Sequence, residues 1–194
     1  MEKLLDPIMK KLLDRGFVDD ENAEIVRYGL ELLIMKTIIS AVMIATAIIT
    51  QSVPEVMVFT LSYALLRGCC GGYHADSRIV CFILSMFLLS AVISAIKLIE
   101  GIAAFFTSIG FICMGIALIV SLAPVDTPNK PFDITERHIF RKRSILISCA
   151  ALLLWTIFTV FRLYNFSLTV SAAVFITGLL LAAGRLSNRK GATT

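Results

Sequence analysis

Six runs of apolar residues separated by short polar segments dominate this sequence, and they constrain its fold more than any other feature. A helix needs about 20 apolar residues to cross a bilayer. With 58% hydrophobic residues among 194, the chain also holds more apolar side chain than one soluble core can bury. We therefore predict an all-α, polytopic membrane protein with about six transmembrane helices. The runs are residues 32–50, 53–66, 79–96, 101–123, 144–161 and 166–183.

The second run is short for a membrane span. About 14 residues rise only about 21 Å in a helix, whereas the hydrocarbon core is about 30 Å thick. We expect the helix to continue through Arg67 to Cys70. Arg67 would then lie about one turn from the helix end, where its guanidinium can reach the membrane interface.

The N-terminal region is polar and amphipathic and does not resemble a cleavable signal peptide. Asp6 as N-cap, Pro7 as first helical residue and Gly16 beyond the last predict a short helix. Its apolar face suits either the inner leaflet or an amphipathic helix of a partner. A second helix is expected to begin near Asp20 and Glu21 and to continue into the first span.

No internal repeat and no long linker divides the sequence, so we predict a single domain over residues 1–194. It comprises the amphipathic N-terminal region (1–31), a transmembrane bundle (32–183) and a tail (184–194). All Lys and Arg except Lys97 and Arg162 fall on one side of this bundle. Basic loops are retained in the cytoplasm, so both termini and the loop before the third span are expected on the cytoplasmic side of the cell membrane.

The net charge of +4 is thus explained by membrane topology, and no nucleic-acid partner is expected, since basic and aromatic residues do not alternate as on a base-stacking surface. The five cysteines are an odd number, and three of them lie on the predicted cytoplasmic side. Free thiols are therefore expected rather than disulfides.

A histidine and three cysteines lie close together before the third span: Cys69, Cys70, His74 and Cys81. One interpretation makes Cys81 a nucleophile and His74 its general base. A zinc site is a second interpretation, although the spacing lacks the usual pair of short ligand arms. Interfacial residues without a chemical role are the third. We predict the nucleophile and base, with neither metal nor cofactor.

Local sequence signals support this prediction. Gly71 and Gly72 end the second helix, because glycine accepts the left-handed conformation of a helix C-cap. Asp76 or Ser77 is expected to cap the third helix, about one turn before Cys81. The helix N-terminus, Arg78 and His74 then favour the thiolate of Cys81. On one continuous helix His74 and Cys81 would be about 10.5 Å apart, so a dyad requires the loop to fold back.

Three prolines within residues 123–131 predict the end of the fourth span and an extended connection. Basic residues follow in the loop before the fifth span. Two interpretations stay open for them: positive-inside anchoring, or a docking patch for an acidic substrate segment. His138 is expected to be an interface residue. The basic residues are Lys130, Arg137, Arg141, Lys142 and Arg143.

Together these residues resemble the accessory gene regulator B (AgrB) family, integral membrane cysteine endopeptidases of bacterial peptide quorum sensing. The resemblance lies in Arg67, Gly72, His74-Ala75 and Cys81, with a second match in Ala123-Pro124, Thr127 and Lys130-Pro131. It implies that His74 is the general base and Cys81 the nucleophile, while Arg67 and Gly72 shape the site. Backbone N–H groups near Gly72 or at the start of the third helix, or Arg67, are candidate oxyanion donors.

The resemblance also implies a substrate, an AgrD-like propeptide with an amphipathic N-terminal helix, a central signal sequence and an acidic C-terminal part. Cleavage through a thioester acyl-enzyme would be followed by closure of a thiolactone or lactone. Membrane lipids are the other expected partners, and a homodimer is implied by the resemblance alone. A peptide exporter or a non-catalytic membrane adaptor is the alternative, although the sequence has no ATP-binding P-loop and no repeated halves.

Overall fold

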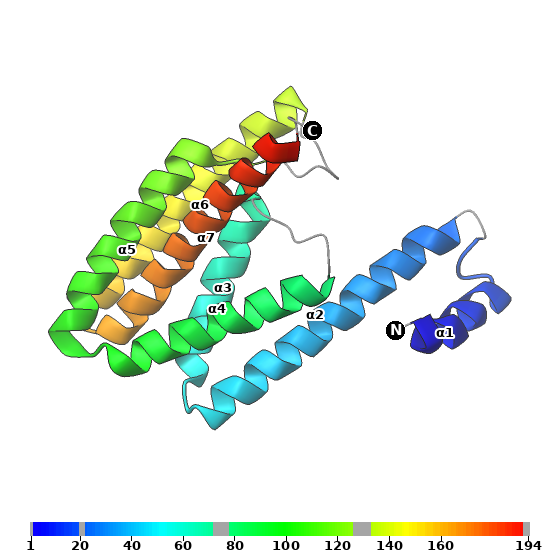
Figure 1. Cartoon of the computed structure of the whole chain (residues 1–194), viewed down its shortest axis with the longest axis horizontal. Helices are drawn as coiled ribbons and strands as arrows, with labels where there is room; N and C mark the ends of the chain where they lie inside the picture. The colour runs from blue at the N-terminus through cyan, green and yellow to red at the C-terminus, as the bar shows by residue number, and fades with distance from the viewer. Residues whose placement is uncertain (1, 20–21, 72–77, 126–132, 192–194) are drawn as a thin grey trace. The chain divides into compact units, whose positions relative to one another are not determined.

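A computed structural model describes residues 2–19, 22–71, 78–125 and 133–191 (Figure 1). Every named element in these ranges is an α-helix. The chain divides into two compact units, Met1–Thr46 and Ala47–Thr194. In order, the helices are α1 (Glu2–Asp14), α2 (Ala23–Ile49), α3 (Val53–Cys70), α4 (Arg78–Leu98), α5 (Gly101–Leu122), α6 (Ile134–Val160) and α7 (Tyr164–Gly191).

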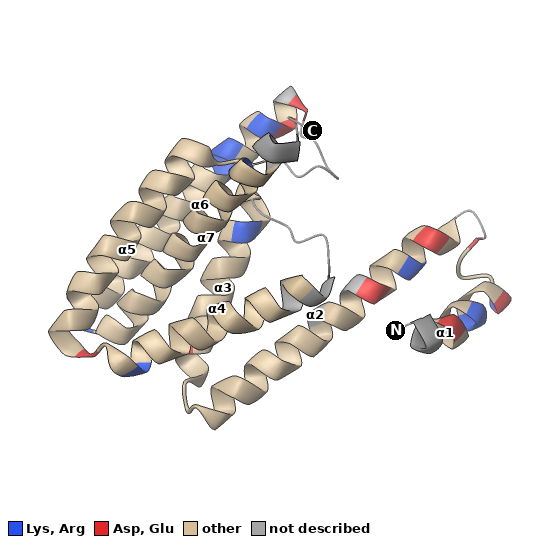
Figure 2. Ribbon diagram, viewed as in Figure 1, with Lys and Arg blue, Asp and Glu red and all other residues tan. Residues whose placement is uncertain are grey.

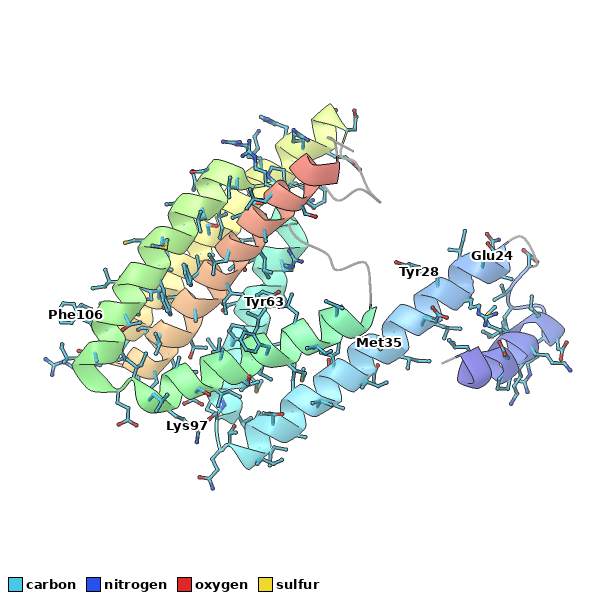
Figure 3. All side chains as sticks on the ribbon, viewed as in Figure 1. Glu24, Tyr28, Met35, Tyr63, Lys97 and Phe106 are labelled. Atoms are coloured by element: carbon cyan, nitrogen blue, oxygen red, sulfur yellow. The ribbon has the colours of Figure 1, made fainter. Side chains whose placement is uncertain are left out.

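Five helices of the described chain are long and apolar enough to cross a membrane, namely α2, α3, α5, α6 and α7. A sixth apolar stretch, Ile83–Leu98 of α4, is shorter. Large apolar side chains are exposed on these helices, and Figure 3 shows Phe106 of α5 pointing away from the neighbouring helices. Such side chains suit contact with lipid. The predicted all-α, polytopic membrane fold is confirmed.

The first unit corrects the predicted start of the N-terminal helix. Helix α1 begins at Glu2, so Pro7 lies inside it and Asp6 is not its N-cap. The Asp6 carboxylate instead accepts a hydrogen bond from Arg27 of α2 at 3.0 Å. Leu5, one residue earlier, is fully buried. Pro7 has no N–H to donate within the helix, so we interpret the burial of Leu5 and the Asp6–Arg27 bond as compensating stabilisation of this turn.

The end of α1 follows the prediction. Gly16 has φ +69°, its N–H donates to the Leu13 carbonyl, and the Phe17 N–H donates to the Leu12 carbonyl. This pair of bonds is a Schellman cap. Helix α2 begins at Ala23, two residues after the expected start, and continues into the first span as predicted.

In the second unit, α7 is the central helix. It contacts α3, α4, α5 and α6, and 67% of its most apolar window is buried, against 28% for α3 and for α5. Many of its buried side chains are small, which lets neighbouring helices approach closely in the absence of a hydrophobic driving force between them. They include Ser167, Thr169, Ser171, Ala172, Ala173 and Thr177.

Helices α5 and α7 approach each other closely at Gly115. A Cβ atom at this position would lie 2.7 Å from the backbone nitrogen of Phe175, so only glycine fits there. The buried residues of α5 recur every three or four positions and form one face toward α7: Ala104, Ser108, Ile112, Gly115 and Ile119. Trp155 of α6 donates a hydrogen bond to the Ser108 hydroxyl at 3.1 Å, which ties a third helix to this interface.

Basic residues gather at one end of the second unit (Figure 2). Arg67 lies in the last turn of α3, and basic residues occupy the first turns of α6. Lys97 lies in the last turn of α4, and Arg162 follows the end of α6, at the opposite end of these helices. The basic end therefore coincides with the end of α3 and the start of α6.

Candidate active site

The predicted nucleophile lies in the first turn of α4. The helix begins at Arg78, so Cys81 is its fourth residue, as expected if Ser77 is the N-cap. Gly72, His74 and Ser77 lie outside the described residues, and the side chains of Arg78 and Cys81 are also not described. The pairing of His74 with Cys81 therefore stays a prediction, and the alternative zinc interpretation, which needs both residues, also falls outside the described side chains.

Gly71 ends α3, as the sequence predicts. Its φ of +71° lies in the left-handed region, and its N–H donates to the Arg67 carbonyl at 3.3 Å. A Cβ atom on Gly71 would meet the carbonyl oxygen of Val125 at 2.4 Å. Two independent constraints, backbone conformation and the close approach of residue 125, thus require glycine here.

The last carbonyl groups of α3 are held by three different donors. The Ser144 hydroxyl of α6 shares its proton between the Phe140 carbonyl at 2.8 Å and the Cys69 carbonyl at 3.1 Å. The Val125 N–H donates to the Cys70 carbonyl at 3.1 Å. The Arg67 side chain donates to the Gly71 carbonyl at 2.5 Å. Helix-end carbonyls have no partner within their own helix, so these bonds fix the end of α3 against α6 and residues 123–125. The loop toward α4 starts from an anchored point.

This arrangement gives Arg67 a definite place. The sequence suggests that its guanidinium reaches the interface and that it is one candidate oxyanion donor. In the structure Nη1 of Arg67 folds back onto the Gly71 carbonyl, so the side chain stabilises the turn that precedes His74. We expect Arg67 to act as a positioning residue.

The thiols next to the turn have distinct surroundings. The described cysteines, Cys69, Cys70, Cys113 and Cys149, are free thiols, in agreement with the prediction for these four. Cys70 is fully buried in an apolar cluster with Leu66, Ile119 and Val125. We therefore interpret Cys70 as a packing residue, whereas Cys69 is partly exposed.

The basic residues after the fourth span lie in a helix, which corrects their assignment to a loop. Helix α6 begins at Ile134 because Asp133 and Glu136 form a capping box around its first turn. The Asp-x-x-Glu pattern was the sequence signal for this start. Arg137, Arg141, Lys142 and Arg143 thus occupy the first three turns of α6. Lys130 lies outside the described residues.

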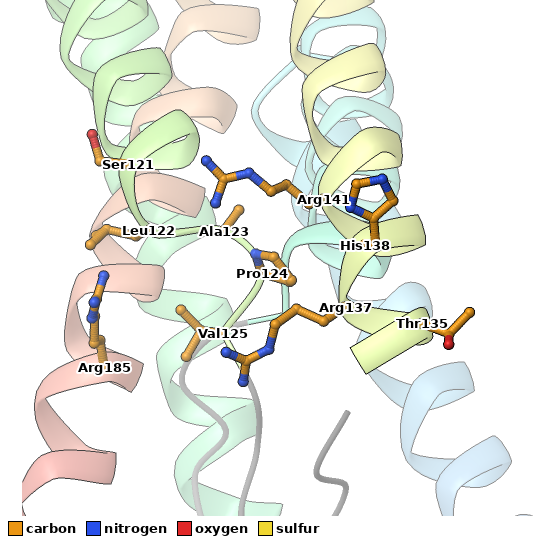
Figure 4. Close-up of a pocket in the computed structure, with 10 residues that line it drawn as sticks. All are labelled: Ser121, Leu122, Ala123, Pro124, Val125, Thr135, Arg137, His138, Arg141 and Arg185. Carbon is orange, nitrogen blue, oxygen red and sulfur yellow. The ribbon is translucent and has the colours of Figure 1, made fainter. Parts of the chain in front are cut away.

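The basic residues of α6 fall into two groups, those that line a pocket and those that do not. Arg137, His138 and Arg141 line a pocket of about 770 Å³, together with residues 121–125, Thr135 and Arg185 (Figure 4). Figure 4 shows the side chains of Arg137 and Arg141 reaching from α6 toward Pro124 and Val125, with Arg185 on the other side. Lys142 and Arg143 are not among the lining residues, and the Arg143 guanidinium lies 5.9 Å from the centre of the Phe140 ring.

Arg185 is the residue that the sequence did not reveal, since its basic charge looked like part of a positive tail. It comes from α7, far along the chain from Arg141, and only the fold brings the two together. The pocket also touches the glycine turn. Val125 lines it, donates to the Cys70 carbonyl, and forms an isolated bridge with Gly71.

The fold and this site define a class: multi-pass helical membrane proteins in which an anchored glycine turn leads into a cysteine-bearing helix beside a basic cluster. Within that class, the chain belongs to the accessory gene regulator B (AgrB) family, whose model matches residues 1–181.

Relatives of similar length support the assignment. An AgrB-like protein of Clostridium perfringens strain SM101 is 26% identical over 191 residues, covering 93% of this chain and 86% of the relative. AgrB-like protein 2 of Clostridium perfringens strain 13 is 24% identical over 187 residues, covering 91% and 85%. An AgrB-like protein of Listeria monocytogenes serotype 4b is 28% identical over 153 residues, covering 75% and 70%. No solved structure matches the chain.

Proposed function

We propose that this protein is a membrane-embedded cysteine endopeptidase that cuts an AgrD-like propeptide and promotes its cyclisation. One observation carries the proposal. In a chain that matches the AgrB family over residues 1–181, His74 falls in sequence between the anchored Gly71 turn and the start of α4 at Arg78, and Cys81 is in the first turn of α4. A helix N-terminus of this kind favours a thiolate.

Chain length supports the pairing of base and nucleophile. His74 is four residues before Arg78, and four extended residues span at most about 14 Å. Gly71, three residues before His74, is fixed by bonds from Arg67 and Val125 to the end of α3. Chain length therefore keeps His74 within about 14 Å of Arg78, and the proposed dyad requires the loop to fold back so that the imidazole reaches the thiol.

The chemistry then runs in two steps. His74 takes the proton of the Cys81 thiol, and the thiolate attacks the scissile carbonyl carbon of the propeptide. As the C–N bond breaks, the leaving amine receives the proton from His74, and the N-terminal part stays on Cys81 as a thioester. A cysteine thiol within the signal sequence next attacks that thioester, releases Cys81 and closes a thiolactone, whereas a serine hydroxyl would give a lactone.

Exchange of an amide for a thioester is uphill, so two conditions follow. Water has to be kept from the thioester, because hydrolysis would yield a linear acid. The released C-terminal fragment also has to be removed, so that the unfavourable equilibrium shifts toward the thioester and the cyclic product. The site lies where α3 ends and α4 begins, in a protein of apolar helices long enough to span a membrane, and such surroundings help to keep water from the thioester.

The reaction is tested with purified protein in lipid vesicles and its cognate propeptide. Mass spectrometry is expected to find the C-terminal fragment and a cyclic product that is one water lighter than the linear acid. An exporter or an adaptor would leave the propeptide intact. Intact propeptide under conditions where the protein is folded would reject the proposed activity.

The basic residues outside the pocket are proposed to dock the acidic part of the propeptide. Lys142 and Arg143 are exposed on α6 and do not line the pocket. Charge reversal of both, to Glu, is expected to raise KM roughly three- to tenfold at low salt and less at high salt, because exposed ion pairs are weak and screened. Steady-state kinetics of propeptide cleavage at two ionic strengths measures this effect.

Lys97→Glu provides the matched control, since it reverses a charge at the opposite end of the second unit. Equal kinetics for the Lys142/Arg143 double variant and for the control would favour simple membrane anchoring over docking.

We also propose that both chain termini and the loop between α3 and α4 face the cytoplasm. The gathering of basic residues where α3 ends and α6 begins supports this orientation for the second unit, and the basic residues of the N-terminal sequence support it for the first. In a variant that keeps Cys69 as its only cysteine, a membrane-impermeant maleimide is expected to label the thiol only after cells are permeabilised. Labelling of Cys69 in intact cells would mean that the orientation is reversed.

A further inference from the structure

The pocket at the basic end shares two lining residues with a second, more apolar cavity. The larger cavity, of about 770 Å³, is lined by Arg137, Arg141 and Arg185 among others. The smaller one, of about 440 Å³, is lined by Leu122, Ala182, Arg185 and Leu186. Leu122 and Arg185 line both. A cationic compartment beside α6 and an apolar compartment between α5 and α7 therefore share Leu122 and Arg185 as walls.

The described lining of the larger cavity is positively charged. Its lining residues include three arginines and a histidine and no carboxylate. Asp133 and Glu136, the acidic residues nearest in sequence, form the capping box of α6 instead. In the described parts of the chain, Arg141 and Arg185 make no ion pair. Two guanidinium groups that line one pocket without an ion pair, here those of Arg141 and Arg185, favour an anion, and guanidinium groups bind phosphate oxygens especially well.

The two cavities lie where a membrane lipid would be found. Leu122 is the last residue of the α5 span, and Arg185 lies near the end of the α7 span, which extends to Ser187. Span ends meet the headgroup region of the bilayer. Large apolar side chains are exposed on the same two helices, Val120 on α5 and Leu179 and Leu186 on α7, so the apolar cavity lies beside a lipid-facing surface.

We propose that this paired cavity binds one anionic phospholipid, with its phosphate at Arg141 and Arg185 and the start of an acyl chain along Leu122, Ala182 and Leu186. The inference goes beyond the proposed function and does not depend on catalysis. An acidic peptide would also satisfy the arginines, but it would have no use for the apolar compartment. A bound lipid would contact Val125, whose N–H holds the end of α3.

Native mass spectrometry of the full-length protein in detergent tests the site. Titration with phosphatidylglycerol is expected to give at least about fivefold tighter binding than phosphatidylcholine. Arg141→Gln and Arg185→Gln should each weaken phosphatidylglycerol binding by about fivefold, the contribution of one cation beside an anionic headgroup. Arg143→Gln, the same change on the same helix outside the lining residues, should leave binding unchanged. Arg141→Lys, which keeps the charge, should retain most of it.

Competition identifies the ligand. Inorganic phosphate and a short glutamate-rich peptide are added to the protein loaded with phosphatidylglycerol. We expect that neither phosphate nor the peptide displaces phosphatidylglycerol when it is added at the same concentration as the lipid. Displacement by phosphate would show that the anion alone binds, and displacement by the peptide would assign the pocket to the acidic substrate segment; either result overturns the lipid site. Equal binding of the two lipids, or an equal loss in Arg143→Gln, would overturn it as well.

Discussion

Replacement of Cys81 by alanine is expected to lower the rate of propeptide cleavage by at least about 1,000-fold, because the reaction loses its nucleophile. Replacement of His74 by alanine should lower the rate by about 100- to 10,000-fold, the range for a general base. Both rates are measured by mass spectrometry of the products in vesicles that hold equal amounts of folded protein.

Cys69→Ala provides the matched control, since it removes a neighbouring, partly exposed thiol at the end of α3. We expect its cleavage rate to stay within about twofold of the wild-type rate, the usual size of effect for a surface substitution. Wild-type rates in Cys81→Ala, or a loss in Cys69→Ala as large as that in Cys81→Ala, would assign the chemistry to another residue.

The second large effect is expected from Gly71→Ala. A non-glycine residue at a φ of +71° costs about 1–2 kcal/mol, and the new Cβ would meet the Val125 carbonyl oxygen at 2.4 Å. The contact is with backbone, so the end of α3 and residues 123–125 have to separate. We expect a lower Tm and a cleavage rate reduced at least about tenfold, because small displacements of a catalytic group are costly.

Gly68→Ala is the matched control, because it tests whether any glycine-to-alanine change near the end of α3 lowers Tm and cleavage. Gly68 lies one turn earlier in α3, and a Cβ there would meet no atom within 4 Å. Alanine is also the better helix former, so Tm and cleavage should be unchanged or slightly raised. If Gly71→Ala behaved like Gly68→Ala in both thermal unfolding and cleavage, the anchored turn would not position the site.

Much of the fold could be predicted from the sequence, because apolar runs long enough to span a bilayer admit few structures. The extension of the second span to Cys70 followed from the thickness of the bilayer, and its end at Gly71 followed from glycine chemistry. The central place of α7 could not be predicted. Lipid and protein interior are both apolar, so hydropathy does not tell a buried span from a lipid-facing one.

The site was only partly predictable for a different reason. Local signals located the glycine turn and the start of α4, since both depend on neighbouring residues. Other features join residues far apart in sequence and could not be predicted. They are the bonds from Ser144 and Val125 to the end of α3, and the pocket that Arg141 and Arg185 both line. The start of α6 also has a local sequence signal, the capping box of Asp133 and Glu136, which the sequence prediction did not include.

The central claim is that Cys81 carries the N-terminal part of the propeptide as a thioester during turnover. The most direct measurement is mass spectrometry of the protein after brief incubation with propeptide, acid quenching and proteolysis. We predict a Cys81 peptide that bears this fragment, is released by hydroxylamine and is absent in Cys81→Ala. Cleavage of the propeptide without an adduct on Cys81, or with the adduct on another cysteine, would contradict the account.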